Sequence, residues 1–320
     1  MNIEEQIIQD YSNPKLDVVQ IDGLVVLKII KQCKEYLPDL VPGQLLGLDI
    51  GTSLEVSNCF PFPNPRDQED ENSESIAEYQ LEMMRYLRDV NIDSNTVGWY
   101  TPTYLNSFFN ESVIETQYNY QATINQKCVV IVYDPIKTSQ GTLSLKCYRL
   151  TQSFMELFKE HPFSRERLDQ ANLHFNDIFE QIPIKIHNSQ LINALLYEFD
   201  GASDNLSTNF DRLNISNTIY LEKVVEGMTE CLESLNQELN KVYTTQRHIQ
   251  TQKNNYIQQK TLEGKKVDEE ELASMIKPAN PPSKLTSLLL TNQINNYCDQ
   301  IHSFSGNSLT KLSLLKELKK

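Results

Sequence analysis

The hydrophobic pattern of this chain changes near residue 200. Before that point, short runs rich in β-branched and aromatic residues, such as 96–100 and 128–133, alternate with amphipathic stretches. Such runs favour strands, so the first part predicts a domain in which strands and helices are interspersed. After that point the apolar residues follow a helical spacing. We therefore expect an α/β domain followed by a C-terminal helical region.

The first predicted helix follows the first predicted strand without a loop. Residues 18–21 are expected to form the strand, and Asp22 stands where it can cap a helix that begins at the next residue. Leu24, Leu27 and Ile30 recur at helical spacing and are expected to face a sheet. The other elements expected in this domain are strands at residues 44–50, 54–60, 96–100, 128–133, 143–150 and 182–186, and a helix at residues 79–90.

Two apolar stripes mark the helical region. One repeats every seven residues, through Leu221, Met228, Leu235 and Val242, which is the spacing of a coiled-coil seam and implies a partner helix. The second stripe lies after residue 284 and comprises Leu290, Ile294, Tyr297, Ile301, Phe304, Leu309, Leu312 and Leu315. The two helices either pack only on each other and on the first domain, or dock into other chains.

These patterns divide the chain into four segments. The α/β domain with its trailing helices is expected at residues 15–205, and the heptad helix at 206–262. A mobile, proline-rich linker is expected at 263–284, where Pro278, Pro281 and Pro282 cluster, and a C-terminal amphipathic helix at 285–320.

The charge of the chain limits its direct ligands. Twenty-nine basic and 43 acidic residues give a net charge of −14, so direct nucleic-acid binding is not expected. No apolar run is long enough to span a membrane, and the acidic N-terminus is unlike a targeting signal. Six dispersed cysteines, with no C-x-x-C spacing, are typical of reduced thiols in small core positions. These features predict a cytoplasmic protein.

Histidine is absent from the first 160 residues. Because imidazole is the usual proton carrier near neutral pH and a preferred zinc ligand, neither a histidine triad nor a two-histidine metal site fits within this part of the chain. The sequence also contains no phosphate-binding glycine loop of the G-x-x-x-x-G-K-[ST] or G-x-G-x-x-G type. Nothing in the residues themselves indicates catalysis.

Several strings occur in an order that carries a family resemblance. Residues 19–31, 58–63 (Asn-Cys-Phe-Pro-Phe-Pro), 97–100 (Val-Gly-Trp-Tyr) and 133–135 (Tyr-Asp-Pro) together resemble the MPN (Mov34) domain family. The resemblance is closest to its non-catalytic branch, and within that branch to subunits of eukaryotic translation initiation factor three. It implies an α/β fold of the MPN type, with a curved mixed sheet flanked by helices.

Catalytic members of this family are zinc isopeptidases, and this chain departs from their motif at each required position. Thr101 and Thr103 stand where the resemblance places the two histidine ligands, Val113 where it places the aspartate ligand, and Leu40 where it places the general-base glutamate. Asp39 is adjacent to Leu40, but neighbouring residues on a strand point to opposite faces. The resemblance therefore implies no metal, no cofactor and no catalytic residue.

The resemblance also implies protein partners. It predicts an MPN–MPN pair with the f subunit of the factor, a helical bundle with further subunits, and through the complex a place on the small ribosomal subunit. The alternative is an inactive MPN subunit of the proteasome lid or the signalosome, and a remote one is a metal-dependent isopeptidase. Eight residues are candidates for partner contact, namely Val26, Ile29, Leu221, Met228, Leu235, Val242, Ile294 and Ile301.

Val26 and Ile29 have two interpretations. They widen the apolar stripe of the first helix beyond the arc that one sheet face needs, so they either contact a paired MPN domain or lie deep within their own domain.

Overall fold

The computed structural model of the chain describes residues 15–63, 73–92, 95–139, 143–159, 168, 173–202, 218–262 and 284–318. The expected proline-rich linker, except for Lys284, therefore lies outside the described residues. The chain divides into two compact units. One comprises residues 1–155, 177–217 and 307–320, and the other residues 156–176 and 218–306.

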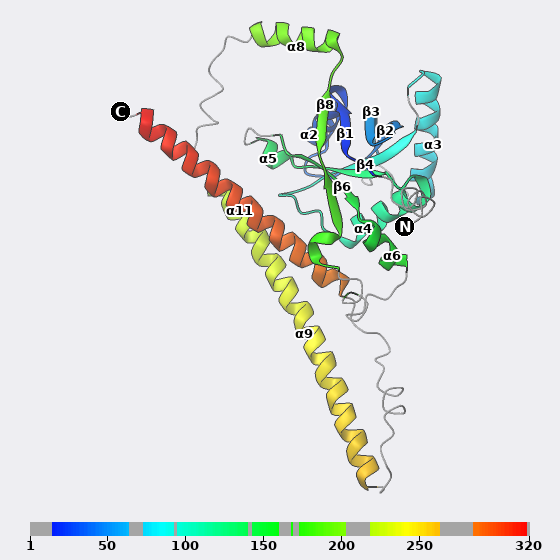
Figure 1. Cartoon of the computed structure of the whole chain (residues 1–320), viewed down its shortest axis with the longest axis vertical. Coiled ribbons are helices and arrows are strands. Elements are labelled where there is room, and N and C mark those ends of the chain that lie inside the picture. Colours follow the sequence, from blue (N-terminus) through cyan, green and yellow to red (C-terminus); the bar gives the residue numbers. More distant parts are fainter. Residues whose placement is uncertain are drawn as a thin grey trace, which may run out of the picture. The chain divides into compact units, whose positions relative to one another are not determined.

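The first unit is built on one eight-stranded mixed sheet (Figure 1). Its strands are β1 (Val18–Asp22), β2 (Gly43–Ile50), β3 (Ser53–Pro61), β4 (Thr96–Pro102), β5 (Val129–Tyr133), β6 (Leu145–Leu150), β7 (Phe179–Ile182) and β8 (Ile184–His187). The spatial order is β7-β6-β5-β4-β2-β3-β1-β8. The pairs β1–β3, β1–β8 and β4–β5 are parallel, and the other pairs are antiparallel. The expected α/β fold is confirmed, and each predicted strand is present except the one at residues 182–186.

The helices of the described residues are α2 (Gly23–Tyr36), α3 (Ser73–Asp89), α4 (Glu111–Asn119), α5 (Pro135–Ser139), α6 (Gln152–Lys159), α8 (Gln190–Ala202), α9 (Thr218–Leu262) and α11 (Leu285–Leu318). A π-helical turn (Tyr120–Ile124) continues α4, and a 3-10 turn (Phe175–Asp177) precedes β7. None of these helices is both long enough and apolar enough to cross a membrane.

The single strand predicted at residues 182–186 is in fact two strands. Pro183 separates β7 from β8, because proline lacks the N–H that a continuous ladder needs. β7 and β8 nevertheless lie at opposite ends of the strand order. Because only one residue joins these two edge strands, the sheet must curl until its two edges lie close together. The Val19 N–H of β1 also donates to the Pro183 carbonyl at 3.0 Å. The sheet is therefore curved and nearly closed.

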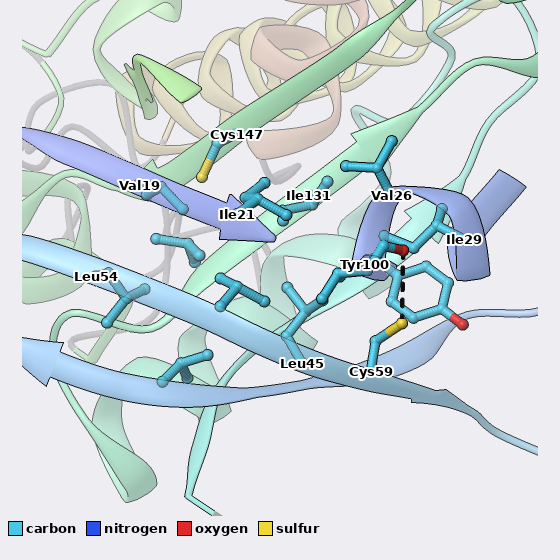
Figure 2. Close-up of a cluster of buried hydrophobic side chains, with 14 of the residues drawn as sticks. Val19, Ile21, Val26, Ile29, Leu45, Leu54, Cys59, Tyr100, Ile131 and Cys147 are labelled. Atoms are coloured by element: carbon cyan, nitrogen blue, oxygen red, sulfur yellow. Dashed lines mark hydrogen bonds between the residues drawn. The ribbon is translucent and has the colours of Figure 1, made fainter. Parts of the chain in front are cut away.

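The curved sheet and α2 enclose the core of the first unit (Figure 2). Val19 and Ile21 of β1, Tyr100 of β4 and Ile131 of β5 are all essentially inaccessible to solvent. The expectation that cysteines fill core positions holds for Cys33, Cys59, Cys128 and Cys147, whereas Cys231 is half-buried and Cys298 is exposed. Burial raises the pKa of the Cys33 and Cys59 thiols to about 12, so both stay protonated at neutral pH.

The second unit contains an antiparallel pair formed by α9 and the first part of α11. The Tyr220 hydroxyl lies 3.0 Å from Gln300 Oε1, and its ring lies against Phe304. Two helical turns further along α9, a Cβ on Gly227 would lie 3.0 Å from the Tyr297 hydroxyl. The small residue thus lets the two helices approach closely.

Gly98 offers a test of how tightly the sheet is packed. A Cβ at this position would lie 2.0 Å from the Val129 carbonyl oxygen of the neighbouring strand, and φ is +158°. We expect Gly98→Ala to destabilise the chain by at least about 2 kcal/mol, since backbone cannot move aside as a side chain can. Urea unfolding followed by the fluorescence of Trp99, the only tryptophan, measures this.

Gly306→Ala is the matched control, because nothing lies within 4 Å of a Cβ added there. It should leave the Trp99 transition unchanged. Equal midpoints for Gly98→Ala and the unsubstituted chain would contradict the packing described above.

Candidate functional site: the zinc-motif positions and the exposed apolar faces

The two threonines at the expected histidine positions lie at the end of the central strand β4. Thr101 is half-buried and pairs with Val132 of β5. Thr103 follows the strand and is only 3 % exposed. Its backbone N–H donates to the Tyr133 carbonyl at 2.8 Å, and its hydroxyl lies 3.4 Å from the same oxygen. Thr103 therefore serves to hold the strand end in place.

The other two motif positions lie on different elements. Val113 is half-buried in the first turn of α4, which begins after Asn110. Leu40 is 44 % exposed in the loop before β2, which starts only at Gly43. The expectation that Asp39 and Leu40 alternate on a strand is thus wrong, because both residues precede the first ladder hydrogen bond of β2.

The residues at these positions do not fit the zinc ion of the catalytic relatives. A valine and a leucine have no ligand atom, and threonine hydroxyls do not replace imidazoles toward zinc. Among the described residues, no group of three or more His, Cys, Asp or Glu side chains is placed to hold a metal. We therefore derive no metal-dependent step for this site.

Asp134 is a buried carboxylate next to Tyr133, whose carbonyl oxygen accepts the hydrogen bond from Thr103. It directly follows β5 and is fully buried. Its Oδ1 accepts hydrogen bonds from the backbone N–H groups of Ile136 and Lys137, at 2.9 and 3.1 Å. Burial raises the pKa of this carboxyl group, although those hydrogen bonds act in the opposite direction. Its position is that of a helix cap for α5.

The outward face of α2 differs from the prediction. Leu24 and Leu27 are 53 % and 63 % exposed, whereas Val26 and Ile29 belong to the buried core together with Val25. The predicted sheet-facing leucines are therefore on the solvent side. Val26 and Ile29, which were candidates for partner contact, are not accessible to a partner in this fold, because their side chains pack on the sheet.

The start of α2 is held by a residue that is distant in the sequence. Asp22 occupies the N-cap position but makes no capping hydrogen bond. Instead Asn188, beyond the end of β8, accepts from the Gly23 N–H through its Oδ1 at 3.1 Å. A residue 165 positions away in the sequence thus caps the helix, which no local pattern could indicate.

α8 is an apolar helix that the sequence analysis did not single out. It begins two residues after Asn188, so it starts close to the N-terminus of α2. Leu191 and Tyr197 are more than four-fifths exposed, and Leu195 and Leu196 are about half exposed. Several large apolar side chains exposed on one short helix are typical of a contact site. The signal that could have found it is the run Leu191-Ile192 and Leu195-Leu196-Tyr197.

The predicted helical seams are present in α9 and α11. Leu221, Met228, Leu235 and Val242 are each half-buried, as are Ile294 and Ile301. α11 also buries a polar set that the sequence analysis missed, comprising Asn292, Gln293, Asn296 and Gln300. Near its C-terminal end, Leu309 is 65 % exposed and Leu312 is 52 % exposed, so the apolar face continues without being covered.

Comparison with known proteins finds two families along the chain. Residues 14–126 match the family described as JAB1/Mov34/MPN/PAD-1 ubiquitin protease. Residues 138–320, more than half of the chain, match the family described as the C-terminal region of eIF3h. The first match agrees with the curved sheet and α2, and the resemblance to the MPN family is confirmed.

Several relatives match this chain over nearly its whole length. The chain is 91 % identical over 320 residues to the H subunit of eukaryotic translation initiation factor 3 from Dictyostelium discoideum, with all of both chains covered. It is 45 % identical over 318 residues to the protein of that name from Arabidopsis thaliana, covering 95 % of this chain and 94 % of the relative. The protein of that name from Nematostella vectensis is 43 % identical, with 95 % of each chain covered. The chain therefore belongs to the family of H subunits of eukaryotic translation initiation factor 3, a family built on the MPN domain.

Proposed function

We propose that this protein is a non-catalytic scaffold subunit of eukaryotic translation initiation factor 3, which supports initiation on the small ribosomal subunit by binding other subunits in the cytoplasm. The observation that carries the proposal is the match over the whole length of the chain to proteins named as the H subunit of that factor. Mass spectrometry of what co-purifies with the tagged chain tests it. Recovery of proteasome-lid or signalosome subunits in place of initiation-factor subunits would overturn it.

The segment boundaries at 15–205, 206–262, 263–284 and 285–320 fit this role. In the proposal, the first segment is the MPN domain, the second and fourth are bundle helices, and the third connects them. The bounds of α9 and α11 support the two helical segments.

The MPN domain is proposed to pair with the f subunit through α2 and α8. Two features support this surface. Leu24 and Leu27 expose apolar area on α2, and the Asn188 hydrogen bond to Gly23 holds the start of α8 near the same helix end. Each leucine transferred from water to an interface would contribute roughly 1.5–3 kcal/mol. The proposed pairing surface therefore contains Leu24 and Leu27, on the side of α2 opposite to Val26 and Ile29, which the sequence had suggested.

The absence of catalysis is proposed on chemical grounds. Zinc enzymes of this family need ligands that stay deprotonated and a base that can take a proton from water. Leu40, Thr101, Thr103 and Val113 provide neither.

Zinc content tests this part of the proposal. The purified protein should contain less than about one-tenth of an equivalent of zinc. A Thr101→His/Thr103→His double variant should still lack it, because Leu40 and Val113 would leave the third ligand and the base absent. Metal analysis of both proteins, alongside a ubiquitin-chain cleavage assay, makes the measurement. One equivalent of zinc in the unsubstituted chain would contradict the proposal.

Another prediction concerns α2. Leu24→Asp/Leu27→Asp should change the stability of the chain by less than about 2 kcal/mol, because both side chains already face solvent, and should abolish capture of the purified f subunit. Val26→Asp is the contrasting variant. It buries an unpaired charge and should cost about 3–5 kcal/mol, which lowers the Trp99 unfolding midpoint. Full capture of the f subunit by the double variant would exclude this face.

A last prediction concerns the end of α11. Leu309→Asp/Leu312→Asp should leave the unfolding of the isolated chain unchanged, since both positions are exposed, but should reduce co-purification of the other subunits. Leu235 and Ile301 are poorer test sites, because they are half-buried already and a charge there would disturb folding and docking together. Thr310→Asp, on the same helix but with a polar starting residue, controls for the added charge. Equal recovery from both variants would refute the role of this face.

A further inference from the structure

Two helices leave the sheet at the same end of two neighbouring strands. β1 and β8 are parallel, and Asp22 pairs with His187 at their carboxyl ends. α2 begins at the residue after Asp22, and α8 follows β8 and begins at Gln190, three residues after His187 (Figure 1). Because parallel strands run in the same direction, the first turns of α2 and α8 start at the same edge of the sheet.

Asn188 joins these two helix starts. Its Oδ1 accepts a hydrogen bond from the Gly23 N–H at 3.1 Å. Its amide also fills the space that a Cβ on Gly23 would occupy, since that Cβ would lie 2.2 Å from the same oxygen. Asp22 makes no side-chain capping hydrogen bond, and its Oδ1 lies 3.9 Å from His187 Nδ1 instead. The residue that precedes α2 thus faces β8, and a residue that follows β8 caps α2.

α8 has a separate N-cap. The Ser189 carbonyl accepts from the Asn193 N–H at 3.0 Å, and the Ile192 N–H donates to Ser189 Oγ at 3.4 Å. Asn188 therefore stands directly before the cap of one helix while its side chain caps another. Its hydrogen bond to Gly23 connects the two helices rather than starting α8.

The direction of α8 depends on its first residues. Every side chain described for residues 191–198 is exposed, so these side chains do not pack the helix firmly against the sheet. A helix without such packing is oriented by the residues that lead into it. Here those residues are Asn188 and Ser189, and Asn188 is tied to α2.

We propose that Asn188 is a positioning residue, which fixes the start of α8 against the start of α2 so that one partner contacts both helices at once. The inference rests on the proposed function, which assigns this surface to the f subunit, and adds the residue that sets the geometry of the surface. Leu24 follows Gly23 directly, and Leu191 is three residues after Asn188, a span of at most about 11 Å. The first apolar residue of each helix is thus close to the contact. Helices held in one arrangement lose less conformational entropy on binding than helices that move independently.

Two substitutions open the Asn188–Gly23 contact from opposite sides. Asn188→Ala removes the acceptor, and Gly23→Ala places a Cβ where the Asn188 amide lies. These are the opening variants. Asn188→Asp is the conservative variant, because a carboxylate oxygen caps a helix as well as an amide oxygen does. Asn125→Ala is the matched control, since Asn125 Oδ1 likewise accepts a backbone N–H, that of Lys127 at 3.0 Å, but in the loop before β5.

The first measurement needs no partner. Spin labels at Lys31→Cys of α2 and Tyr197→Cys of α8, both exposed positions, report the distance between the two helices. The full chain carries Cys231→Ser and Cys298→Ser as well, because the other four cysteines are buried.

We expect one narrow distance distribution for the chain with no further change, for the conservative variant and for the control. Both opening variants should broaden the distribution. A role in stability alone would not broaden it, since the measurement reports only folded molecules when the Trp99 unfolding transition shows that the variants are folded.

The second measurement is the Kd of the full chain for the purified f subunit. Each opening variant should raise the Kd at least about tenfold, and the control less than about twofold. The conservative variant should stay within about threefold of the unsubstituted chain. Adding Leu191→Asp to Asn188→Ala should raise the Kd less than about threefold beyond the larger single effect, because α8 no longer contributes once its position is lost.

Four results would overturn the inference. They are a broad distance distribution in the chain without an opening substitution, an equally narrow one in the opening variants, a Kd that both opening variants leave unchanged, and single effects of Asn188→Ala and Leu191→Asp that simply multiply. If the opening variants bind normally while Leu24→Asp/Leu27→Asp does not bind, the inference fails and the proposed pairing stands. An unsubstituted chain that does not bind the f subunit would contradict the proposed pairing, and the inference with it.

Discussion

The link between β7 and β8 determines the architecture of the MPN unit. One residue, Pro183, joins two strands that lie at opposite ends of an eight-strand order, so the sheet must curl until its edges approach. The curled sheet creates an interior that α2 and the inward side chains of β1, β4 and β5 fill. Close backbone approach follows, as at Gly98, where the chain has no room for a Cβ beside Val129.

This closure also decides which side of α2 is available to a partner. The helix leaves β1 without a loop and is capped by Asn188 from just beyond β8, so its rotation about its own axis is fixed by tertiary contacts. The sequence contains two apolar stripes on α2, one with Leu24 and Leu27 and one with Val26 and Ile29, and helical spacing alone does not rank them. The wrong stripe was expected to face the sheet for that reason.

Most of the fold could be predicted from local patterns. Strands such as β5 are continuous β-branched runs, the β2–β3 hairpin turns at Gly51, and the seam of α9 follows a strict heptad. What could not be predicted depends on residues distant in sequence, such as the split at Pro183 and the cap from Asn188. The buried amides of α11, including Asn292, carry no hydrophobic signal. At the motif positions, identity alone was sufficient to argue against zinc, whereas the loop position of Leu40 required the structure.

The fold serves to present surfaces to partners. We propose that two apolar faces, on α2 with α8 and at the end of α11, are covered in the assembled factor. Hydrogen exchange of the free chain and of the chain within purified initiation factor 3 measures this most directly. We expect slower exchange on assembly at residues 190–202 and 309–317, with no change in β5, which is already buried. Unchanged exchange at both segments would contradict this proposal.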